Sequence, residues 1–463
     1  MSAVPADGVV DVRPQSPEEK VLVHCITWSF GYYLIGGLYV LGPVLGWSLL
    51  LMLARRDGLR AVPAVMWAWV VGMLVMLVAV VVAHADYGLG LGPTIKSSIG
   101  WAKGWALMAV FILIGSGQIR IEVLSRAMCV LGVQILCLLP LLAMAWAVGL
   151  PGHLYVSPLS IVGGPGPEYF AVELYGLNAQ TGLPRWRLFA PWAPAMGLVM
   201  SCFVLIAMHE RRPLLRAAGI LGMLMAIYGS GSRLGLIALP VVAVVLTVWR
   251  HMDRPVLYLA MAPASLVVGV MAPYIQTLIE DFTQRFHGAR ADSSRVRAAL
   301  GRIAVQRWET EAYWWGHGNV ERGPHLVEYM PIGSHHTWYG LLFVKGMVGL
   351  IALAVPMAWT AWMLLVGGRA SKAGVSAFGI LMILGLYALS ENLEMLAYLY
   401  WPGLVVLGMG LRDVANERRR RRAALSTVTG ESLAVTYTPT AASSSSSASP
   451  VSPVSPVSPL TAS

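Results

Sequence analysis

The feature that most constrains this chain is a series of apolar segments, most of them long enough to cross a lipid bilayer as a helix of about 20 residues. Only 12% of the residues are charged, against roughly 25% in soluble domains, and 57% are apolar. These values exclude a soluble enzyme, a disordered chain and a disulfide-stabilised secreted domain. The pattern predicts an all-α polytopic membrane protein with apolar segments at 21–33, 34–53, 61–84, 100–119, 127–150, 188–208, 214–229, 233–249, 255–275, 337–366, 374–390 and 394–411.

The number of spans depends on residues 21–53, which contain Gly36 and Gly37. A break at these glycines gives about twelve transmembrane helices and a cytoplasmic N-terminal tail at 1–20. One tilted helix over the whole stretch gives eleven helices and an N terminus on the outer side. The sequence leaves both alternatives open.

Positive charge gathers in one alternating set of short loops. This set holds twelve arginines and lysines, whereas the opposite set holds only Lys96 and Arg233. By the positive-inside rule the first set is cytoplasmic, and the basic run Arg418–Arg422 indicates a cytoplasmic C terminus. The net charge of +10 is therefore a sign of topology, and we expect no nucleic-acid partner. The twelve residues are Arg55, Arg56, Arg60, Arg120, Arg126, Arg211, Arg212, Arg216, Arg250, Arg254, Arg369 and Lys372.

Two long loops then fall on the outer, periplasmic side. The first loop, at 151–187 within the transmembrane region 21–275, is rich in Gly and Pro and is expected to be irregular. The second and larger loop, at 276–336, precedes the C-terminal transmembrane helices at 337–411. The last region, 412–463, is basic and then rich in Ser and Pro, which predicts a disordered cytoplasmic tail.

The large loop is expected to be partly helical. The stretch 293–308 can begin at a cap formed by Ser293 or Ser294. Its apolar residues recur at helical spacing, as in a helix that lies on the membrane or packs over the spans. These residues are Val296, Leu300, Ile303 and Trp308.

Ionisable side chains are scarce within the spans, where only His24 and Lys345 stand out. An ion-coupled carrier usually keeps such groups at mid-membrane, so their scarcity disfavours a carrier. Polar residues instead gather at the outer boundary in three clusters. These clusters are Pro184–Trp192, Gly229–Arg233 and Gly333–Trp338.

The residue types in these clusters suit a phosphate-bearing substrate. A guanidinium is always protonated, and its planar fork of donors matches phosphate oxygens, so Arg185, Arg187 and Arg233 are candidates for holding a diphosphate. A histidine has a pKa near working pH and can act as a general base, which makes His335 and His336 candidates. Together they suit a reaction in which a lipid diphosphate leaves and a hydroxyl attacks.

Simpler roles remain open for each of these residues. Arg185 or Arg187 can bind lipid head groups, Arg233 can be structural, and a histidine at the end of a span is often only an interfacial polar residue. The outer loops lack an Asp-x-Asp or Asp-Asp pair, which argues against a divalent-metal clamp. Four histidines could instead form a zinc site, although their spacing matches no standard zinc pattern. They are His317, His325, His335 and His336.

Four short stretches follow one another between about residues 185 and 350. They are Arg187–Pro191, Ser230–Gly235, Trp315–Gly318, and His335–Trp338 followed by Gly346–Gly349. In this order and placement they resemble the O-antigen ligase and O-antigen polymerase superfamily. Its members carry an Arg-led segment ending in Pro-Asn, a Ser-Arg turn, a Gly-x-Gly step, and a His-Asn segment leading to Gly-x-x-Gly.

The resemblance implies a GT-C-like membrane glycosyltransferase that works at the periplasmic face of the bacterial inner membrane. The transfer would be inverting and independent of metals and other cofactors, with a glycan on undecaprenyl diphosphate as donor. Arg187 and Arg233 would hold the diphosphate, with Arg185 beside them, and His335 would take the proton from the acceptor hydroxyl.

Two acidic residues near the last span compete for one role in this scheme. Glu391 can orient His335, and Glu394, one helical turn further, is the alternative. The sequence departs from the family at Trp192 and His336, where Asn is usual, so His336 is a secondary candidate.

The resemblance leaves the acceptor open. A ligase passes the glycan to lipid A-core, a polymerase passes it to another lipid-linked unit, and some relatives modify protein hydroxyls. The alternative from another functional class is a transporter or flippase that moves a lipid-linked glycan without making a bond. Membrane lipids are expected partners in either case.

Overall fold

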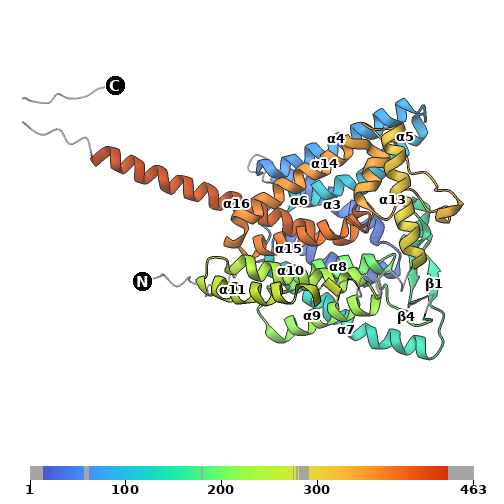
Figure 1. Cartoon of the computed structure of the whole chain (residues 1–463), viewed down its shortest axis with the longest axis horizontal. Coiled ribbons are helices and arrows are strands. Elements are labelled where there is room, and N and C mark those ends of the chain that lie inside the picture. The colour runs from blue at the N-terminus through green and yellow to red at the C-terminus, as the bar shows by residue number, and fades with distance from the viewer. Residues whose placement is uncertain are drawn as a thin grey trace, which may run out of the picture. The chain divides into compact units, whose positions relative to one another are not determined.

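The computed structural model describes residues 14–56, 62–178, 181–274, 276–277, 280 and 291–435. It is mostly helical, and eight helices in the described chain are long and apolar enough to cross a membrane. Three shorter apolar helices accompany them, at Ala193–Ala207, Pro255–Val270 and Lys372–Tyr387. The chain is therefore a polytopic membrane protein (Figure 1). The exact number of spans stays a prediction.

Short connections join the helices α1 to α7 before the first long loop, and the helices α8 to α11 after it. Before the first long loop they are α1 (Pro17–Thr27), α2 (Ser29–Leu34), α3 (Leu38–Arg56), α4 (Ala64–Asp86), α5 (Leu91–Lys103), α6 (Trp105–Ile114) and α7 (Ile121–Ala147). After it come α8 (Ala193–Ala207), α9 (Pro213–Ser230), α10 (Arg233–His251), α11 (Pro255–Val270), α13 (Ala291–Glu311), α14 (Thr337–Gly367), α15 (Lys372–Tyr387) and α16 (Leu393–Val435).

The break expected near Gly36 is present, because α2 ends at Leu34 and α3 begins at Leu38. Gly36 has φ +68°, a conformation that favours glycine, and a Cβ there would lie 2.2 Å from the Cβ of Ser157. The first loop therefore contacts the backbone at this break. The N-terminal stretch is shorter than the predicted tail, since α1 begins at Pro17 behind a Ser16 capping box. Residues 1–13 lie outside the described residues.

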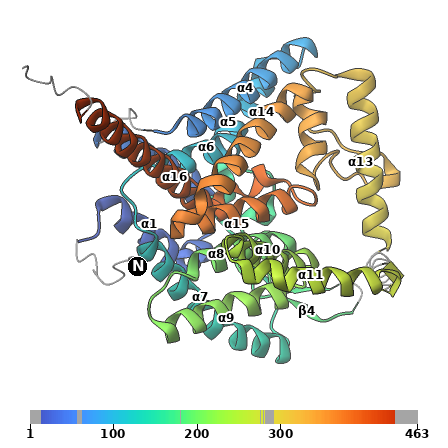
Figure 2. The same ribbon diagram turned by 60° about the vertical axis from the view of Figure 1, so that its left-hand side comes forward.

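The centre of the helix bundle consists of helices that are apolar on every side. All ten residues of α6 are buried, and in α8 every residue except Pro194 is buried. A helix that is hydrophobic all round belongs in a core, and in Figure 2 α6 lies beside α5, and α8 beside α10 and α15. The span predicted at 100–119 is different from the structure, which has a longer helical stretch interrupted at Gly104 between α5 and α6.

A second interruption lies inside α14, at Gly346, where φ is +62° and ψ is −162°. The freed backbone groups bond to the segment before it: His317 N–H donates to Phe343 O at 2.8 Å, and Gly318 N–H to Val344 O at 2.9 Å. On the other side of the kink, Met347 N–H donates to Tyr313 O at 2.9 Å. Buried backbone groups need such partners. The Gly-x-Gly step and the Gly-x-x-Gly segment therefore form one structural unit.

The first long loop, which was expected to be irregular, contains some regular structure. It contains two small antiparallel sheets, β1 (His153–Val156) with β2 (Ala171–Glu173), and β3 (Gly176–Leu177) with β4 (Pro184–Arg185). The helix predicted at 188–208 begins only at Ala193, so the Arg187–Trp192 segment is free to turn into the site. The bundle is helical as predicted, and the short strands of this loop were not predicted.

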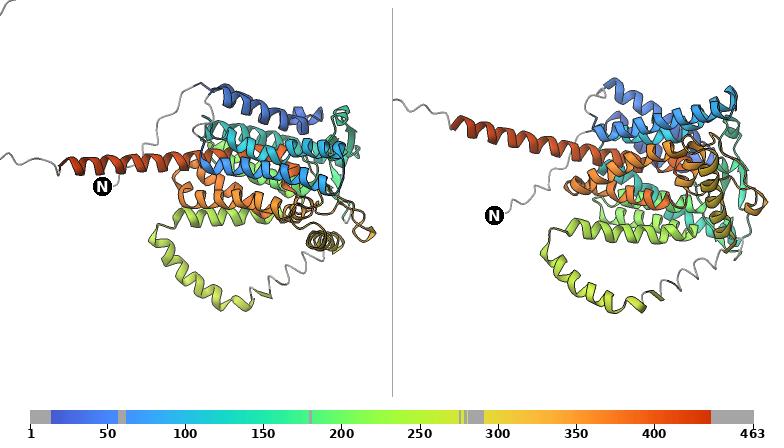
Figure 3. Two further views of the ribbon diagram at one scale, coloured as in Figure 1. Left: turned by 90° about the horizontal axis from the view of Figure 1, so that it is seen from above. Right: turned by 45° about the horizontal axis from the view of Figure 1, so that its top comes forward.

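The helix predicted at 293–308 is confirmed as α13, which runs from Ala291 to Glu311. Because it begins at Ala291, neither Ser293 nor Ser294 is its N-terminal cap. Its buried residues Val296, Leu300 and Ala304 pack with Phe343 of α14. In Figure 3 α13 lies at the same end of the bundle as the small sheets.

Ion pairs connect the arginine-rich short loops at the opposite end. Arg369 pairs with Asp253 at 2.9 Å, Arg126 with Glu210 at 3.2 Å, and Lys372 with Glu122 at 3.5 Å. The charge asymmetry of the sequence thus corresponds to two distinct ends of the bundle. This unit of the chain ends at Asn416.

The second unit, from Glu417 onward, contains the rest of α16 up to Val435. Within it Arg421 pairs with Glu417 at 2.8 Å, one helical turn away. The predicted disordered tail falls mostly on residues 436–463, which lie outside the described residues.

Candidate active site

A cavity of about 650 Å³ lies at the end of the bundle that carries the small sheets and α13. It brings together residues from four parts of the chain: the first long loop, α13, the end of the second loop, and the turn before α16. Four residues proposed from the sequence line it, and two further ones join them. The lining includes Arg185, Arg187, Trp192, Arg297, His335 and Glu391.

Arg187 enters this cavity because of the backbone beside it. Leu188 has φ +49°, a strained conformation for a residue with a side chain. Leu188 is buried and lines a different cavity, whereas Arg187 lines the site. The Arg187 guanidinium donates to Pro191 O at 3.1 Å and forms an ion pair with Glu173 of β2. Partial burial lowers the pKa of Arg187 from its usual value.

Arg185 is committed to holding a turn in place. Its Nε donates to Ser230 O at 3.0 Å, and the backbone N–H of Trp186 donates to Gly229 O at 3.1 Å. These bonds fix the first long loop to the turn between α9 and α10. Arg185 also lines the cavity, but its main contacts hold the neighbouring turn in position.

Arg233, a predicted site residue, does not line the cavity. It is the first residue of α10, after the N-cap Ser232, whose side chain accepts from Gly235 N–H at 3.2 Å. Its turn is the one held by Arg185. Arg233 therefore lies next to the site and is not among the residues that line it.

Glu391 is the most unusual group in the cavity. It is 2% exposed, and one carboxylate oxygen accepts from the indole N–H of Trp192 at 2.8 Å. The other oxygen, Oε1, has no hydrogen-bond partner in the described chain and lies 4.0 Å from Nη2 of Arg297. Burial raises the pKa of Glu391 to about 7. A buried carboxyl with an unpaired oxygen and such a pKa is typical of acid–base chemistry.

His335 lines the same cavity, and within the described chain its ring makes no hydrogen bond. Burial and the nearby charge of Arg297 lower its pKa to about 4, so the ring is neutral at pH 7. Glu391 was expected to orient His335, but the described chain has no hydrogen bond between these two side chains. Glu391 bonds to Trp192 instead. Glu391 and His335 therefore line the same cavity without bonding to each other.

His336 and Glu394 lie apart from this cavity. His336 is the N-cap of α14: its Nδ1 accepts from Tyr339 N–H at 3.3 Å, and its ring stacks on that tyrosine at 3.9 Å. Glu394 lines a second cavity together with Lys345, so it does not compete with Glu391 for contact with His335.

The zinc alternative has no support in the geometry of His317. That ring is 3% exposed, stacks on Phe343 at 4.3 Å, and bonds to Glu311 at 2.8 Å and to Phe343 O at 3.0 Å. It stabilises the loop that bonds to the kink of α14. Among the described residues, no three His, Cys, Asp or Glu side chains gather as a metal site would require.

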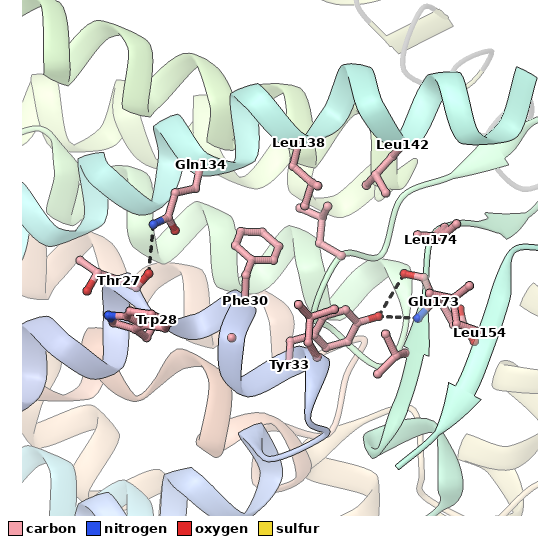
Figure 4. Close-up of a pocket in the computed structure, with 14 residues that line it drawn as sticks. Thr27, Trp28, Phe30, Tyr33, Gln134, Leu138, Leu142, Leu154, Glu173 and Leu174 are labelled. Atoms are coloured by element: carbon pink, nitrogen blue, oxygen red, sulfur yellow. Dashed lines mark hydrogen bonds between the residues drawn. The ribbon is translucent and has the colours of Figure 1, made fainter. Parts of the chain in front are cut away.

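An apolar groove of about 570 Å³ runs from α1 and α2 to the small sheets, as Figure 4 shows. Phe30, Leu138 and Leu142 line its middle, and Tyr33 and Glu173 stand at one end. There the Tyr33 hydroxyl donates to Glu173 O at 3.1 Å and accepts from Glu173 N–H at 2.7 Å. The Glu173 side chain pairs with Arg187, so the groove ends beside the site.

Two residues of the site were missed in the sequence. Arg297 is one of four arginines on α13, and nothing in a helical pattern tells which of them faces the cavity. Trp192 was noted only as a departure from the family's Asn, yet its indole N–H holds Glu391. The sequence did carry one signal for Trp192: the family's Asn and this Trp can both donate a hydrogen bond from that position.

The family comparison covers the middle part of the chain. Residues 218–354 match the family model described as O-antigen ligase. The resemblance to the O-antigen ligase and polymerase superfamily is confirmed. The matched segment contains Arg233, Arg297 and His335, whereas Arg187 and Glu391 lie outside it. No curated protein matches the chain. The match indicates glycan transfer of the ligase or polymerase type, from a lipid-linked glycan to a polysaccharide acceptor.

Proposed function

We propose that this protein transfers a glycan from undecaprenyl diphosphate to an acceptor hydroxyl at the periplasmic face of the bacterial inner membrane. The observation that carries the proposal is one cavity in which Arg187, Arg297, His335 and Glu391 meet. Two guanidinium groups suit a diphosphate, and two groups able to accept a proton suit the attack of a hydroxyl.

The two parts of the donor lipid bind in the two cavities that meet near Arg187. The apolar groove beside Glu173 takes part of the polyprenyl chain, and Arg187 and Arg297 take the diphosphate. Binding of the diphosphate competes with Glu173 for Arg187. Arg233, on the adjoining turn, is proposed as a further contact that forms when the donor is bound.

The transfer itself is proposed as a single displacement with inversion. The acceptor oxygen attacks the anomeric carbon of the donor, the bond from that carbon to the diphosphate oxygen breaks, and undecaprenyl diphosphate leaves with the electron pair. The acceptor proton passes to His335, and the arginines stabilise the charge on the leaving group. The arginines supply this charge without a metal ion or cofactor.

Donor binding is proposed to activate His335. In the free protein Arg297 disfavours the imidazolium and lowers the pKa of His335. A diphosphate at Arg297 offsets that positive charge, so the pKa of His335 rises when the donor is in place. The ionised Glu391 carboxylate then stabilises the imidazolium. The base thus gains strength only when there is a leaving group to displace.

The decisive experiment uses His335→Ala in purified, reconstituted protein. Donor binding is expected to stay within about twofold, and the transfer rate is expected to fall by about 10²–10⁴, the usual cost of losing a general base. A flippase predicts the opposite pattern: lipid-linked glycan crosses the membrane at an unchanged rate in the variant, and wild-type protein forms no glycan–acceptor bond.

A further inference from the structure

A second cavity, of about 170 Å³, lies directly beside the candidate active site. Ser334 and Met395 line both cavities, so the two spaces meet there. The proposed mechanism uses none of the other residues of the second cavity. Its polar lining includes Ser97, Asn319, Ser334, Thr337, Lys345, Asn392 and Glu394.

Lys345 is held in this cavity by the kink of α14. It directly precedes Gly346 and is only 5% exposed. A Cβ on Gly349 would lie 2.3 Å from the Cβ of Lys345, so only glycine leaves room for the lysine stem. The ammonium lies 5.7 Å from the centre of the Trp105 ring and is attracted by Glu394. The kink thus places one positive and one negative group in the same small space.

Several polar atoms at this cavity have capacity left for a ligand. Ser334 Oγ is buried and makes no hydrogen bond within the described chain. Trp105 Nε1 is also buried, and the Glu394 carboxyl lies close to it without making a well-aligned hydrogen bond. Trp105 itself is 2% exposed. Asn392 also lines the cavity, and its Oδ1 accepts from Glu394 N–H at 3.1 Å. Buried polar groups usually have partners, so unpaired ones here point to a bound molecule.

The charges and the size decide which class of molecule fits. Glu394 disfavours an anion such as a phosphate, and Lys345 disfavours a cation, whereas hydroxyl groups can bond to both. The volume equals about six waters at roughly 30 Å³ each, which corresponds to a single sugar ring. It is too small for a whole oligosaccharide, because ligand pockets usually measure about 300–1,000 Å³.

We propose that the second cavity binds one sugar ring of the acceptor glycan and presents a neighbouring hydroxyl to His335. This inference rests on the proposed function, since an acceptor presupposes transfer. In the proposed function the donor binds along the groove and at Arg187, and the second cavity meets the first at Ser334, the residue before His335. A displacement with inversion needs the acceptor on the side away from the leaving group.

Gly100 offers a matched pair of variants. It lines the second cavity, and a Cβ at this position would have no heavy atom within 4 Å. Gly100→Ala adds little bulk in open space and serves as the control. Gly100→Phe adds a large ring at the edge of the second cavity, and Gly100 does not line the first cavity. Asn392→Asp keeps the oxygen that caps α16 and removes the amide donor, and Ser334→Ala removes only the unpaired hydroxyl.

The test measures two kinds of binding on the purified, full-length protein in nanodiscs. Methyl glycosides of glucose, galactose, mannose, rhamnose and N-acetylglucosamine are screened by saturation-transfer difference NMR. Inorganic diphosphate is titrated by calorimetry. At least one glycoside is expected to bind wild type and Gly100→Ala equally, and at least fivefold more weakly to Gly100→Phe, Asn392→Asp and Ser334→Ala. Diphosphate is expected to bind wild type, Gly100→Ala and Gly100→Phe equally.

Two outcomes overturn the proposal and leave the proposed function standing. One is that no glycoside binds wild type while diphosphate does. The other is that a glycoside binds Gly100→Phe as well as it binds Gly100→Ala, which would put the sugar elsewhere and make Lys345 and Glu394 a purely structural pair. Failure of diphosphate to bind wild type would instead count against the donor site, independently of the sugar.

Discussion

At the scale of single residues, we expect donor binding to depend most on Arg187. Arg187→Lys keeps the charge but loses the planar fork, so we expect donor affinity to fall about 10- to 100-fold, the value of one or two charged hydrogen bonds. Arg233→Lys should cost less, because Arg233 does not line the cavity. Titration of both variants with undecaprenyl diphosphate in nanodiscs checks the order. A larger loss in Arg233→Lys would place the diphosphate at the α9–α10 turn.

The pH dependence should follow Glu391. Its pKa of about 7 in the free protein means that the carboxylate forms only as the pH rises through 7. If the carboxylate stabilises the imidazolium, kcat/KM rises with pH through that value, and Glu391→Gln removes the rise and lowers the plateau. His335 cannot cause this limb, since its pKa is about 4 before the donor binds. An unchanged limb near pH 7 in the Gln variant would exclude Glu391 as its source.

The same group makes folding stability depend on pH. Because burial raises the folded-state pKa of Glu391 above its usual value, the folded state binds more protons than the unfolded state up to about pH 7. The free energy of unfolding therefore falls as the pH rises through this window. Glu391→Gln should flatten that decline, which thermal unfolding at several pH values can measure. A decline of the same slope in the variant would assign it to other groups.

The transfer reaction should need no divalent metal, because the guanidinium groups at the diphosphate provide positive charge directly. Purified protein in excess chelator is expected to keep most of its turnover. A loss of activity that one added metal ion restores would contradict this prediction.

The candidate site could be predicted from the sequence only where residue type and boundary position coincide. Arg185, Arg187, His335 and Glu391 were found in this way and line one cavity. Arg297 could not be found, because its role depends on how α13 packs over the bundle. The pairing of Glu391 with Trp192 joins residues 199 positions apart, which no local pattern encodes.

At the scale of elements, the kink of α14 is the feature that orders the site. A Cβ on Gly346 would lie 2.3 Å from Trp314 O, and its φ of +62° is strained for any other residue. Gly346→Ala is therefore expected to lower the unfolding temperature and to abolish transfer. Gly385→Ala in α15 is the control, because its Cβ would have no heavy atom within 4 Å. Similar unfolding temperatures for both variants would show that the kink is not required.

The elements show why some boundaries were predicted and others not. The break at Gly36 is marked by two adjacent glycines, and it is one of the two alternatives that the sequence left open. The break at Gly104 is not marked in this way: a Cβ there would lie 2.6 Å from Glu394, so the glycine is required by a contact with α16. The small sheets of the first loop are as short as two residues, too short for a periodic pattern.

At the scale of the whole molecule, the charge asymmetry of the short loops predicts which end faces the cytoplasm. The arginine-rich loops meet at one end of the bundle, and α13 and the site lie at the other. From the positive-inside rule we therefore expect the site to face the periplasm. Single cysteines at Glu309 of α13 and at Ala370 before α15, both exposed positions, test this directly.

The labelling is done on intact spheroplasts with a membrane-impermeant maleimide, after replacing Cys137, the exposed native cysteine, by alanine. Glu309→Cys is expected to react from outside, and Ala370→Cys only after the membrane is permeabilised. Equal labelling of Ala370→Cys once detergent is added shows that the position is reactive. Labelling of Ala370→Cys but not Glu309→Cys in intact cells would invert the topology. The site would then face the cytoplasm, where the proposed periplasmic transfer cannot take place.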